Sequence, residues 1–260
     1  MYQYITYIME LIRNINKTRT ILKSYLQKEW DTSVIQDVSE KEVEIMYTVK
    51  SSGNPMFSAL GQATGCHMSL QHRHIPSHYL HIIYFGFPKL GESPTKLTKT
   101  CSEKIQKLYD SEVFGADDSL LLILPQPLSE TVVKAMEDLN AECQHTLIEK
   151  GLQPETLQEN EKLDERHTYS QRHFRNIHVF HIDTLTIDIT RHVRVPQQEC
   201  IRDQKTIDEV LKSCNASLRQ LPVIKRTDPQ AKCMRMAPGD ICKITRKTSS
   251  GYSISYRVCQ

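Results

Sequence analysis

The sequence predicts two domains, an α/β domain over residues 1–190 and a smaller α+β domain over residues 191–260. Stretches of strand character alternate with stretches of helical spacing through the first 190 residues, which is typical of an α/β domain. The chain ends in two strand-like stretches joined by Ser249-Ser250-Gly251, which is typical of a hairpin that closes a mixed sheet. A chain of 260 residues is long enough for two modest cores.

The composition is that of an ordinary globular protein, with 39% hydrophobic residues, 25% charged residues and a net charge of +2. From Ser217 to the end, nine basic residues stand against two acidic ones, so this part carries a charge near +7. Such a surface favours phosphate groups or an acidic protein surface, although a solvated basic face is the alternative. Eight cysteines without a CxxC pair favour a reducing compartment, and no apolar stretch is long enough to cross a membrane.

The first elements are helical. Apolar residues keep helical spacing from Tyr4 to Leu26 and predict one long helix or two consecutive helices. Ser39 and Glu42 then form a capping box, which predicts the start of another helix because each side chain can satisfy an exposed amide. Residues 51–65 are rich in glycine and predict a loop.

Five histidines and Cys66 lie between residues 66 and 81. A zinc site would require Cys66, His72, His78 and His81 to converge within about 2 Å of one ion, which demands a loop folded over them. The simpler interpretation is a strand over residues 78–85 with histidines at its polar end. We therefore predict no metal site and no cofactor.

The middle of the first domain predicts a buried strand between two helices. The apolar run Ser119–Leu124 predicts a central strand covered on both faces, preceded by an amphipathic helix over residues 103–109. Ser129 caps a helix that follows it, and a helix N-terminus after a strand offers free amides to an anion. Two further short strands are predicted over residues 177–180 and 185–189.

A polar stretch interrupts this domain at about residues 141–175, where seven acidic residues stand against five basic ones. We interpret it as an insertion with a helix to about Glu149 and a solvated loop from Pro154 to Ser170. A dedicated docking site is the alternative.

Helix-capping residues follow the start of the second domain. Thr206 and Glu209 form a capping box for one helix, and Ser217 caps the next turn. Asp228 and Pro229 open a short helix.

The end of the chain alternates polar and apolar residues. Pro238-Gly239-Asp240 marks a turn before the first hairpin strand. The apolar members of the last strand, which we expect in the core, are Tyr252, Ile254, Tyr256 and Val258.

The order of motifs in this second domain resembles the C-terminal module of the fifth subunit shared by eukaryotic nuclear RNA polymerases, which has an archaeal counterpart in the same family. The motifs are LPxI, R-x-DP, a basic residue before PGD, K-I-x-R-K and Y-x-I-x-YRVC. They fall at Leu221, Pro222, Ile224, Arg226, Asp228, Pro229, Arg235, Pro238, Gly239, Asp240, Lys243, Ile244, Arg246, Lys247, Tyr252, Ile254, Tyr256, Arg257, Val258 and Cys259.

This resemblance implies a non-catalytic subunit of a multisubunit DNA-dependent RNA polymerase that takes part in transcription. Its C-terminal domain is expected to dock on the largest subunit, among the other polymerase subunits. The residues expected to make partner contacts are Arg226, Asp228, Pro229, Arg246 and Arg257. A solvated role for the basic side chains among them is the alternative.

The resemblance also implies a restriction-endonuclease-like jaw domain over residues 1–190, beside downstream double-stranded DNA that it does not read by sequence. The family's Thr-Pro-Ser-Ala motif near DNA aligns with residues 129–132, where Ser129 and Thr131 keep the hydroxyls and Glu130 replaces the proline. Lys134 is the nearest candidate phosphate ligand.

No catalytic residue is predicted. Nucleases of the related fold need an Asp and an acid-x-Lys on one strand, and residues 120–124 contain neither an acid nor a lysine. The only acid-x-Lys, Asp203-Gln204-Lys205, stands at a helix start, and the motifs GxSxG, GxxxxGK[ST], GxGxxG and HExxH are missing. The alternative to a polymerase subunit is a free-standing nucleic-acid or protein-binding adaptor that uses the same module.

Two departures from the family pattern indicate that this chain is a diverged member of the family. Gln197 and Gln198 stand where the family carries a basic residue and a histidine, and the polar insertion exceeds the family pattern. A large DNA virus that encodes its own polymerase is a plausible source. We expect a nuclear protein if the source is cellular, and a protein of the virion or of the host cytoplasm or nucleus if it is viral.

Overall fold

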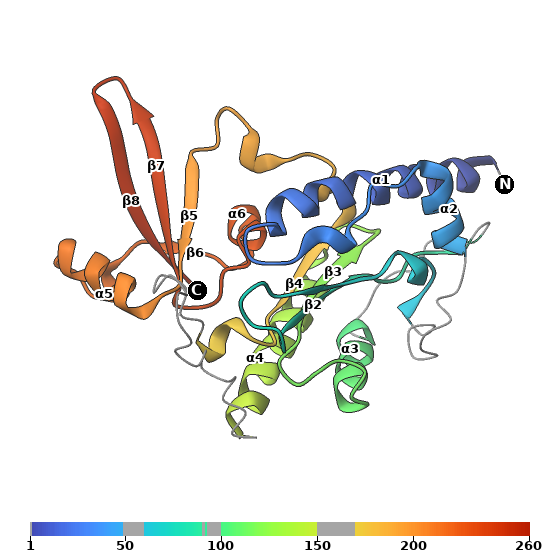
Figure 1. The fold of residues 1–260 in the computed structure, drawn as a ribbon, viewed down its shortest axis with the longest axis horizontal. Helices are drawn as coiled ribbons and strands as arrows, with labels where there is room; N and C mark the ends of the chain where they lie inside the picture. The colour runs from blue at the N-terminus through green and yellow to red at the C-terminus, as the bar shows by residue number, and fades with distance from the viewer. Residues whose placement is uncertain (1, 49–59, 90–91, 93–99, 150–169) are drawn as a thin grey trace. The chain divides into compact units, whose positions relative to one another are not determined.

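The computed structural model describes residues 2–48, 60–89, 92, 100–149 and 170–260 (Figure 1). The described chain forms two compact units, one from residues up to 149 together with 175–187, the other from residues 170–174 together with 188–260. Both units contain helices and a sheet, in agreement with a mixed α and β fold class. Among the described residues, no helix is both long enough and apolar enough to cross a membrane.

The first unit is organised around a four-stranded sheet with the order β1-β2-β3-β4. Its strands are β1 Met68–Gln71, β2 Tyr79–Tyr84, β3 Ser119–Leu124 and β4 Ile177–His181. β1 is antiparallel to β2, while β2, β3 and β4 are parallel to one another. All six residues of β3 are buried, so the prediction of a central strand covered on both faces is confirmed.

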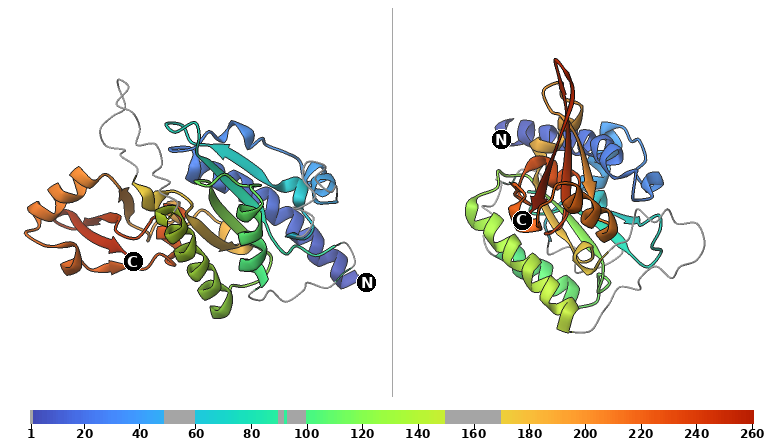
Figure 2. Two further views of the ribbon diagram at one scale, coloured as in Figure 1. Left: turned by 90° about the horizontal axis from the view of Figure 1, so that it is seen from below. Right: turned by 90° about the vertical axis from the view of Figure 1, so that its left-hand side faces the viewer.

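Helices cover both faces of this sheet. α3 Thr100–Asp110 and α4 Glu130–Glu149 lie side by side on one face (Figures 1 and 2), where Ile105 and Met136 pack in one cluster with Leu122 of β3. Because strand side chains alternate between faces, Tyr84 points to the face opposite Ile83, which belongs to that cluster. α1 Tyr2–Leu26 lies on this second face, and the hydroxyls of Thr18 and Tyr84 are 2.9 Å apart.

The predicted capping box at Ser39 is confirmed. The Glu42 carboxylate accepts from the Ser39 amide at 2.7 Å, and the Ser39 hydroxyl accepts from the Glu42 amide at 3.4 Å, at the start of α2 Glu40–Thr48. Short 3₁₀ helices complete this part of the unit at Thr32–Val34 and Thr64–Cys66. Most of the predicted loop over residues 51–65 lies outside the described residues.

The strand predicted over residues 185–189 is wrong. Two 3₁₀ helices occupy this region, Ile182–Leu185 and Ile189–Arg191. The Thr186 hydroxyl donates to the Asp183 carbonyl at 2.7 Å, and the Asp188 carboxylate accepts from the Thr190 amide at 3.0 Å. These local hydrogen bonds compete with strand pairing, and strand β4 ends at His181.

The second unit holds a four-stranded mixed sheet with the order β5-β7-β8-β6. Its elements are the 3₁₀ helix Gln171–His173, β5 Gln197–Ile201, α5 Gln204–Ser213, the 3₁₀ helix Leu218–Gln220, β6 Val223–Ile224, α6 Pro229–Cys233, β7 Ile241–Thr248 and β8 Gly251–Cys259. β7 is antiparallel to β5 and β8, and β6 is parallel to β8. The predicted closing hairpin is confirmed.

Each face of this sheet has its own small core. Ile241 and Val258 pack with Ile207 of α5 on one face, and Cys242 and Ile244 pack with Ala231 of α6 on the other. This division follows from the alternation of side chains along paired strands.

The expectation that the last strand is core along its whole length is wrong for two residues. Val258 is buried, but Tyr252 is 75% exposed and Ile254 is 53% exposed. The reason lies in the lengths of the flanking strands, since β6 pairs with only two residues of β8, Val258 and Cys259. No element of the described chain covers the outer part of the hairpin.

The helix caps of the second unit are partly as predicted. Ser217 with Gln220 forms a capping box, and Asp228 accepts from the Gln230 amide at 2.9 Å as the cap of α6. The cap predicted at Thr206 is wrong, because Asp203 caps α5 and accepts from both the amide and the hydroxyl of Thr206 at 2.8 and 2.7 Å.

Candidate functional site

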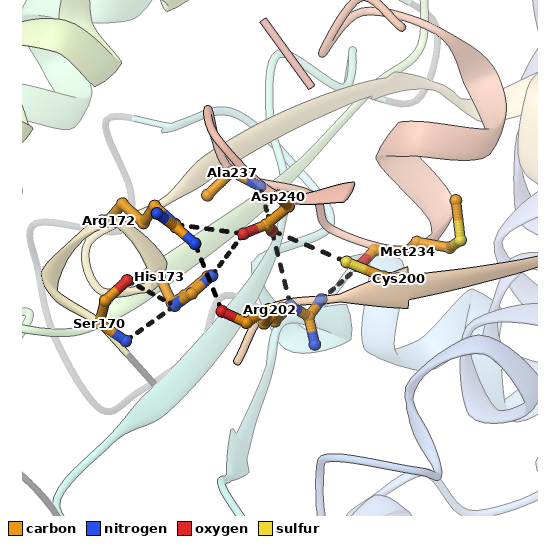
Figure 3. A network of polar contacts seen from close by, with 8 residues as sticks. All are labelled: Ser170, Arg172, His173, Cys200, Arg202, Met234, Ala237 and Asp240. Atoms are coloured by element: carbon orange, nitrogen blue, oxygen red, sulfur yellow. Dashed lines mark hydrogen bonds and ion pairs between the residues drawn. The ribbon is translucent and has the colours of Figure 1, made fainter. Parts of the chain in front are cut away.

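A network of polar contacts surrounds Asp240 in the Pro238-Gly239-Asp240 turn of the second unit (Figure 3). Gly239 has a φ of +93°, and a Cβ at this position would lie 3.1 Å from Nη1 of Arg172, so backbone and packing both favour glycine. Asp240 follows it with a side chain that is 0% exposed. The turn therefore places a carboxylate inside the unit, where it requires hydrogen-bond partners.

Both oxygens of the Asp240 carboxylate are engaged. Oδ1 accepts from Arg172 Nε at 3.2 Å and lies 2.8 Å from His173 Nε2. Oδ2 accepts from the Ala237 amide at 2.8 Å and lies 3.8 Å from Nε of Arg202. One carboxylate thus joins the β7 turn to the 3₁₀ helix at residues 171–173 and to the chain after β5.

The hydrogen bonds of His173 show which of its ring nitrogens accepts and which one donates to Asp240. Its Nδ1 lies 3.0 Å from the Ser170 amide, which donates to it, so Nδ1 is the acceptor nitrogen. Nε2 then carries the proton and donates to Asp240, and a neutral ring satisfies both contacts. Burial alone would raise the pKa of Asp240, but the hydrogen bond from His173 and the nearby Arg202 lower it below its ordinary value.

The contacts around Asp240 stabilise the fold of the second unit. Asp240 is inaccessible to solvent, and Cys200, whose Sγ donates to Asp240 at 3.7 Å, has a pKa raised well above its ordinary value by burial and by that carboxylate. A thiol with a raised pKa stays protonated and is a poor nucleophile. The arrangement stabilises the Pro238-Gly239-Asp240 turn.

The residues expected to contact a partner lie in the second unit and differ in exposure. Arg246 is exposed on β7, whereas Arg257 is half-buried and donates to the Val223 carbonyl at 3.2 Å. The Arg226 amide donates to the Gln260 carbonyl at 2.7 Å, and Asp228 with Pro229 forms the start of α6. Asp228 and Pro229 thus shape the chain, and Arg246 presents its charge to solvent.

The residues expected near DNA line or border a groove between α3 and α4 of the first unit. Thr131 and Lys134 line this groove, whose volume is about 770 Å³, and the Ser129 carbonyl accepts from the amides of Val132 and Val133 in the first turn of α4. Four acidic residues also line it, namely Glu103, Glu130, Asp138 and Glu142. The field around Lys134 is therefore acidic, which disfavours phosphate there.

Two of the five histidines between residues 67 and 81 lie in the core of the first unit. His72 and His78 are buried against Trp30, with ring centroids 4.9 and 5.1 Å from it. His81 Nε2 lies 2.9 Å from Oδ2 of Asp118. Burial alone would raise the pKa of Asp118, but the hydrogen bond from His81 lowers it. Among the described residues, no group of three or more His, Cys, Asp or Glu side chains is arranged to hold a metal ion.

Known proteins with a similar sequence match the second unit. A family described as RNA polymerase Rpb5, C-terminal domain, matches residues 187–259. Subunit Rpo5 of the DNA-directed RNA polymerase of Sulfolobus acidocaldarius is 40% identical over 72 residues, which make up 84% of that protein and 27% of this chain. The corresponding subunit of Archaeoglobus fulgidus is 43% identical over 68 residues, which make up 88% of that protein and 26% of this chain. The chain belongs to the Rpb5 family of RNA polymerase subunits.

The Rpb5 match coincides with the longer segment of the second unit, which begins at residue 188. It includes the Pro238-Gly239-Asp240 turn and the closing hairpin. The shorter segment, with Arg172 and His173, lies outside the matched range.

Sequence reasoning missed these two residues, together with Cys200 and Arg202. It assigned residues 141–175 to a polar insertion, where an Arg-His pair gives no periodic signal. The usable signal was Asp240, because a buried carboxylate demands basic or donor partners. The sequence alone does not say which of the basic residues supplies them.

Proposed function

We propose that this chain is a non-catalytic subunit of a multisubunit DNA-directed RNA polymerase. The observation that carries the proposal is the match of residues 187–259 to a polymerase subunit family, with identities of 40–43% to two relatives named as Rpo5 subunits. The geometry is compatible with it, because the motif residues build a turn and a hairpin. β3, where a related nuclease would carry its acids, is apolar from Leu120 to Leu124 and buried.

In this proposal the second unit docks on the largest polymerase subunit, among the other subunits. Its basic charge and the exposed Arg246 support contact with an acidic protein surface. Asp228 and Pro229 contribute by fixing the start of α6. The protein acts wherever that polymerase acts, in the nucleus of a cell or, if a large DNA virus encodes it, in the virion or the host cell.

The first unit acts as a jaw of restriction-endonuclease-like fold beside the entering DNA duplex, without reading its sequence. A mixed sheet with helices on both faces is compatible with such a fold. Ser129, Thr131 and Lys134 border the DNA path. Because acidic residues line the groove around Lys134, these residues bind DNA weakly.

Purification of the native complex tests the proposal. The full chain carries an affinity tag and is purified from its own source through high salt. We expect one copy of the chain per polymerase, together with the two catalytic subunits, because a built-in subunit resists salt that removes loosely bound proteins. A chain that elutes alone, or with other partners, would contradict the proposal and favour the free-standing adaptor.

A further inference from the structure

The hairpin of β7 and β8 extends beyond the sheet that supports it (Figure 1). On the β7 side, the pairing with β5 ends at Thr245, which faces Gln197. On the β8 side, β6 reaches only Val258 and Cys259. The outer part of the hairpin is therefore a two-stranded ribbon, and β8 has the longer free edge.

The direction of the hydrogen bonds shows which backbone groups face that edge. The Cys259 amide donates to the Asp240 carbonyl on the β7 side, whereas the Val258 amide donates to Pro222 on the β6 side. Because successive residues of an antiparallel strand point to opposite edges, Tyr252, Ile254 and Tyr256 direct their amides and carbonyls outward, as Val258 does. Within the described chain, no strand pairs with β8 at these three residues on that edge.

The side chains along this edge are unusual for an exposed strand. Tyr252 and Ile254 are 75% and 53% exposed, and Tyr256 is half-buried on the same face. Residues 251–256 contain no charge and no proline. Natural proteins protect free edges with charges, prolines or bulges, so an apolar edge without them indicates a place where another strand pairs.

Charge indicates the chemistry of that strand. Arg246 faces Ser253 and Arg257 faces Cys242 across the hairpin, so both arginines lie on the face opposite Tyr252 and Ile254. Lys243 and Lys247 face Tyr256 and Tyr252, so the two lysines lie on the same face as these tyrosines. From residue 241 to the end the chain has four basic residues and no acidic one. A second copy of this hairpin would bring like charges together, whereas an acidic strand would complement them.

We infer that the outer edge of β8, from Tyr252 to Tyr256, receives an extended segment of another polymerase subunit as a fifth strand. In this segment, apolar residues pack on the side of Tyr252 and Ile254, and acidic residues alternate with them on the side of Arg246 and Arg257. Backbone pairing supplies affinity and the alternating side chains supply selectivity. The inference rests on the proposed function and states how the second unit is bound to the rest of the polymerase.

Ile254→Pro in the full chain tests this pairing. The proline removes an outward amide, and proline is tolerated in a strand whose N–H faces solvent, so the pairing of β7 with β8 is kept. We expect at least a tenfold loss of retention on the polymerase after a high-salt wash. Ile254→Val keeps the amide and most of the apolar side chain and serves as the matched control, with less than a threefold loss. Arg246→Glu is expected to lose as much as the proline variant.

Hydrogen exchange provides a readout that does not depend on substitutions. In the isolated chain, the amides of Tyr252, Ile254 and Tyr256 are expected to exchange quickly and those of Ser253 and Ser255 slowly, since only the latter donate to β7. In the purified polymerase the first three are expected to become protected. The exchange of Ser253 and Ser255 in the isolated Ile254→Pro chain reports whether its hairpin is intact.

The outcomes separate the inference from the proposed function. A chain that co-purifies with the polymerase while Ile254→Pro is retained like Ile254→Val, and while the three amides stay unprotected, overturns the edge pairing and leaves the family assignment standing. A wild-type chain that does not co-purify overturns the proposed function itself. Protection of the same amides in the isolated chain at high concentration shows that a second copy occupies the edge and also overturns the inference.

Discussion

Asp240 shows how one residue of a short motif organises a whole unit. Its carboxylate has zero exposure and bonds to Arg172, His173 and the Ala237 amide. A buried charge is tolerated only when such partners surround it, so the Pro238-Gly239-Asp240 turn and residues 170–173 depend on each other. The motif is thus explained by folding within the unit, independently of any partner.

The lowered pKa of Asp240 makes this contribution dependent on pH. A carboxyl group whose folded pKa lies below its unfolded value, about 3.9, stabilises the fold fully above that value and loses its contribution as pH falls through the folded pKa. We expect Asp240→Asn to reduce the free energy of unfolding by roughly 3 kcal/mol at neutral pH. The difference from wild type should shrink below about pH 4, as measured by urea unfolding across a pH series.

Asp208→Asn is the matched control, because Asp208 is exposed on α5. We expect little change from it at any pH. A loss for Asp240→Asn that stays constant down to the lowest pH would show that shape, and not charge, accounts for the role of Asp240.

Among the elements, the caps decide where helices begin. Asp203 is buried and accepts from the amide and hydroxyl of Thr206, so it occupies the role that the sequence pattern assigned to Thr206. The mistake arose because both residue types cap helices, and their order along the chain does not tell which one has extended backbone. Asp203 has φ −64° and ψ 127°, which is the extended conformation of a capping residue.

Substitution at these two positions tests the assignment. Asp203→Ala is expected to reduce the free energy of unfolding by about 1–2 kcal/mol, because it leaves an amide at the start of α5 without an acceptor. Thr206→Ala keeps that acceptor and is expected to cost less than half as much. Denaturant unfolding of both variants compares them, and equal losses would contradict Asp203 as the cap.

Elements also differ in how fully they are covered. β3 is buried along its length because β2 and β4 flank it and helices lie over both faces. β8 has the same apolar alternation as a half-buried strand but is flanked for only two residues by β6. The apolar pattern is therefore the same signal for a core strand and for a docking edge, and only the neighbouring strands separate the two cases.

Across the molecule, charge is divided unevenly between the units. Residues 217–260 of the second unit carry a charge near +7, more than the +2 of the whole chain, while the α3–α4 groove of the first unit is lined by more acids than bases. This distribution suits an acidic surface or phosphate groups as the partner of the second unit, and it favours only weak contact of the groove with DNA.

Lys134→Ala tests the DNA-proximal prediction in assembled polymerase. One phosphate contact changes the slope of log affinity against log salt by roughly one unit at most, and the acidic neighbours of Lys134 reduce that effect further. We expect a small decrease in slope for downstream DNA retention in elongation complexes. Lys107→Ala, on exposed α3 surface outside the groove lining, is the control. An unchanged slope for Lys134→Ala would remove this residue from the DNA-proximal set.

Local signals in the sequence were enough to establish several elements and the family. The apolar run at Ser119–Leu124, the capping box at Ser39, the cap at Ser217 and the closing hairpin are encoded within a few neighbouring residues. The family was recognisable because its motifs keep their order over the last forty residues.

Contacts between residues that lie far apart in the sequence, in contrast, were visible only in the folded chain. Arg172 lies 68 residues before Asp240 and His173 lies 67 before it, and no local pattern links them. The exposure of Tyr252 and Ile254 was equally hidden, because it depends on where β5 and β6 end. Local chemistry determines most helices and strands, whereas the choice between two neighbouring capping residues, the partners of a buried charge and the coverage of a strand are decided only in the folded chain.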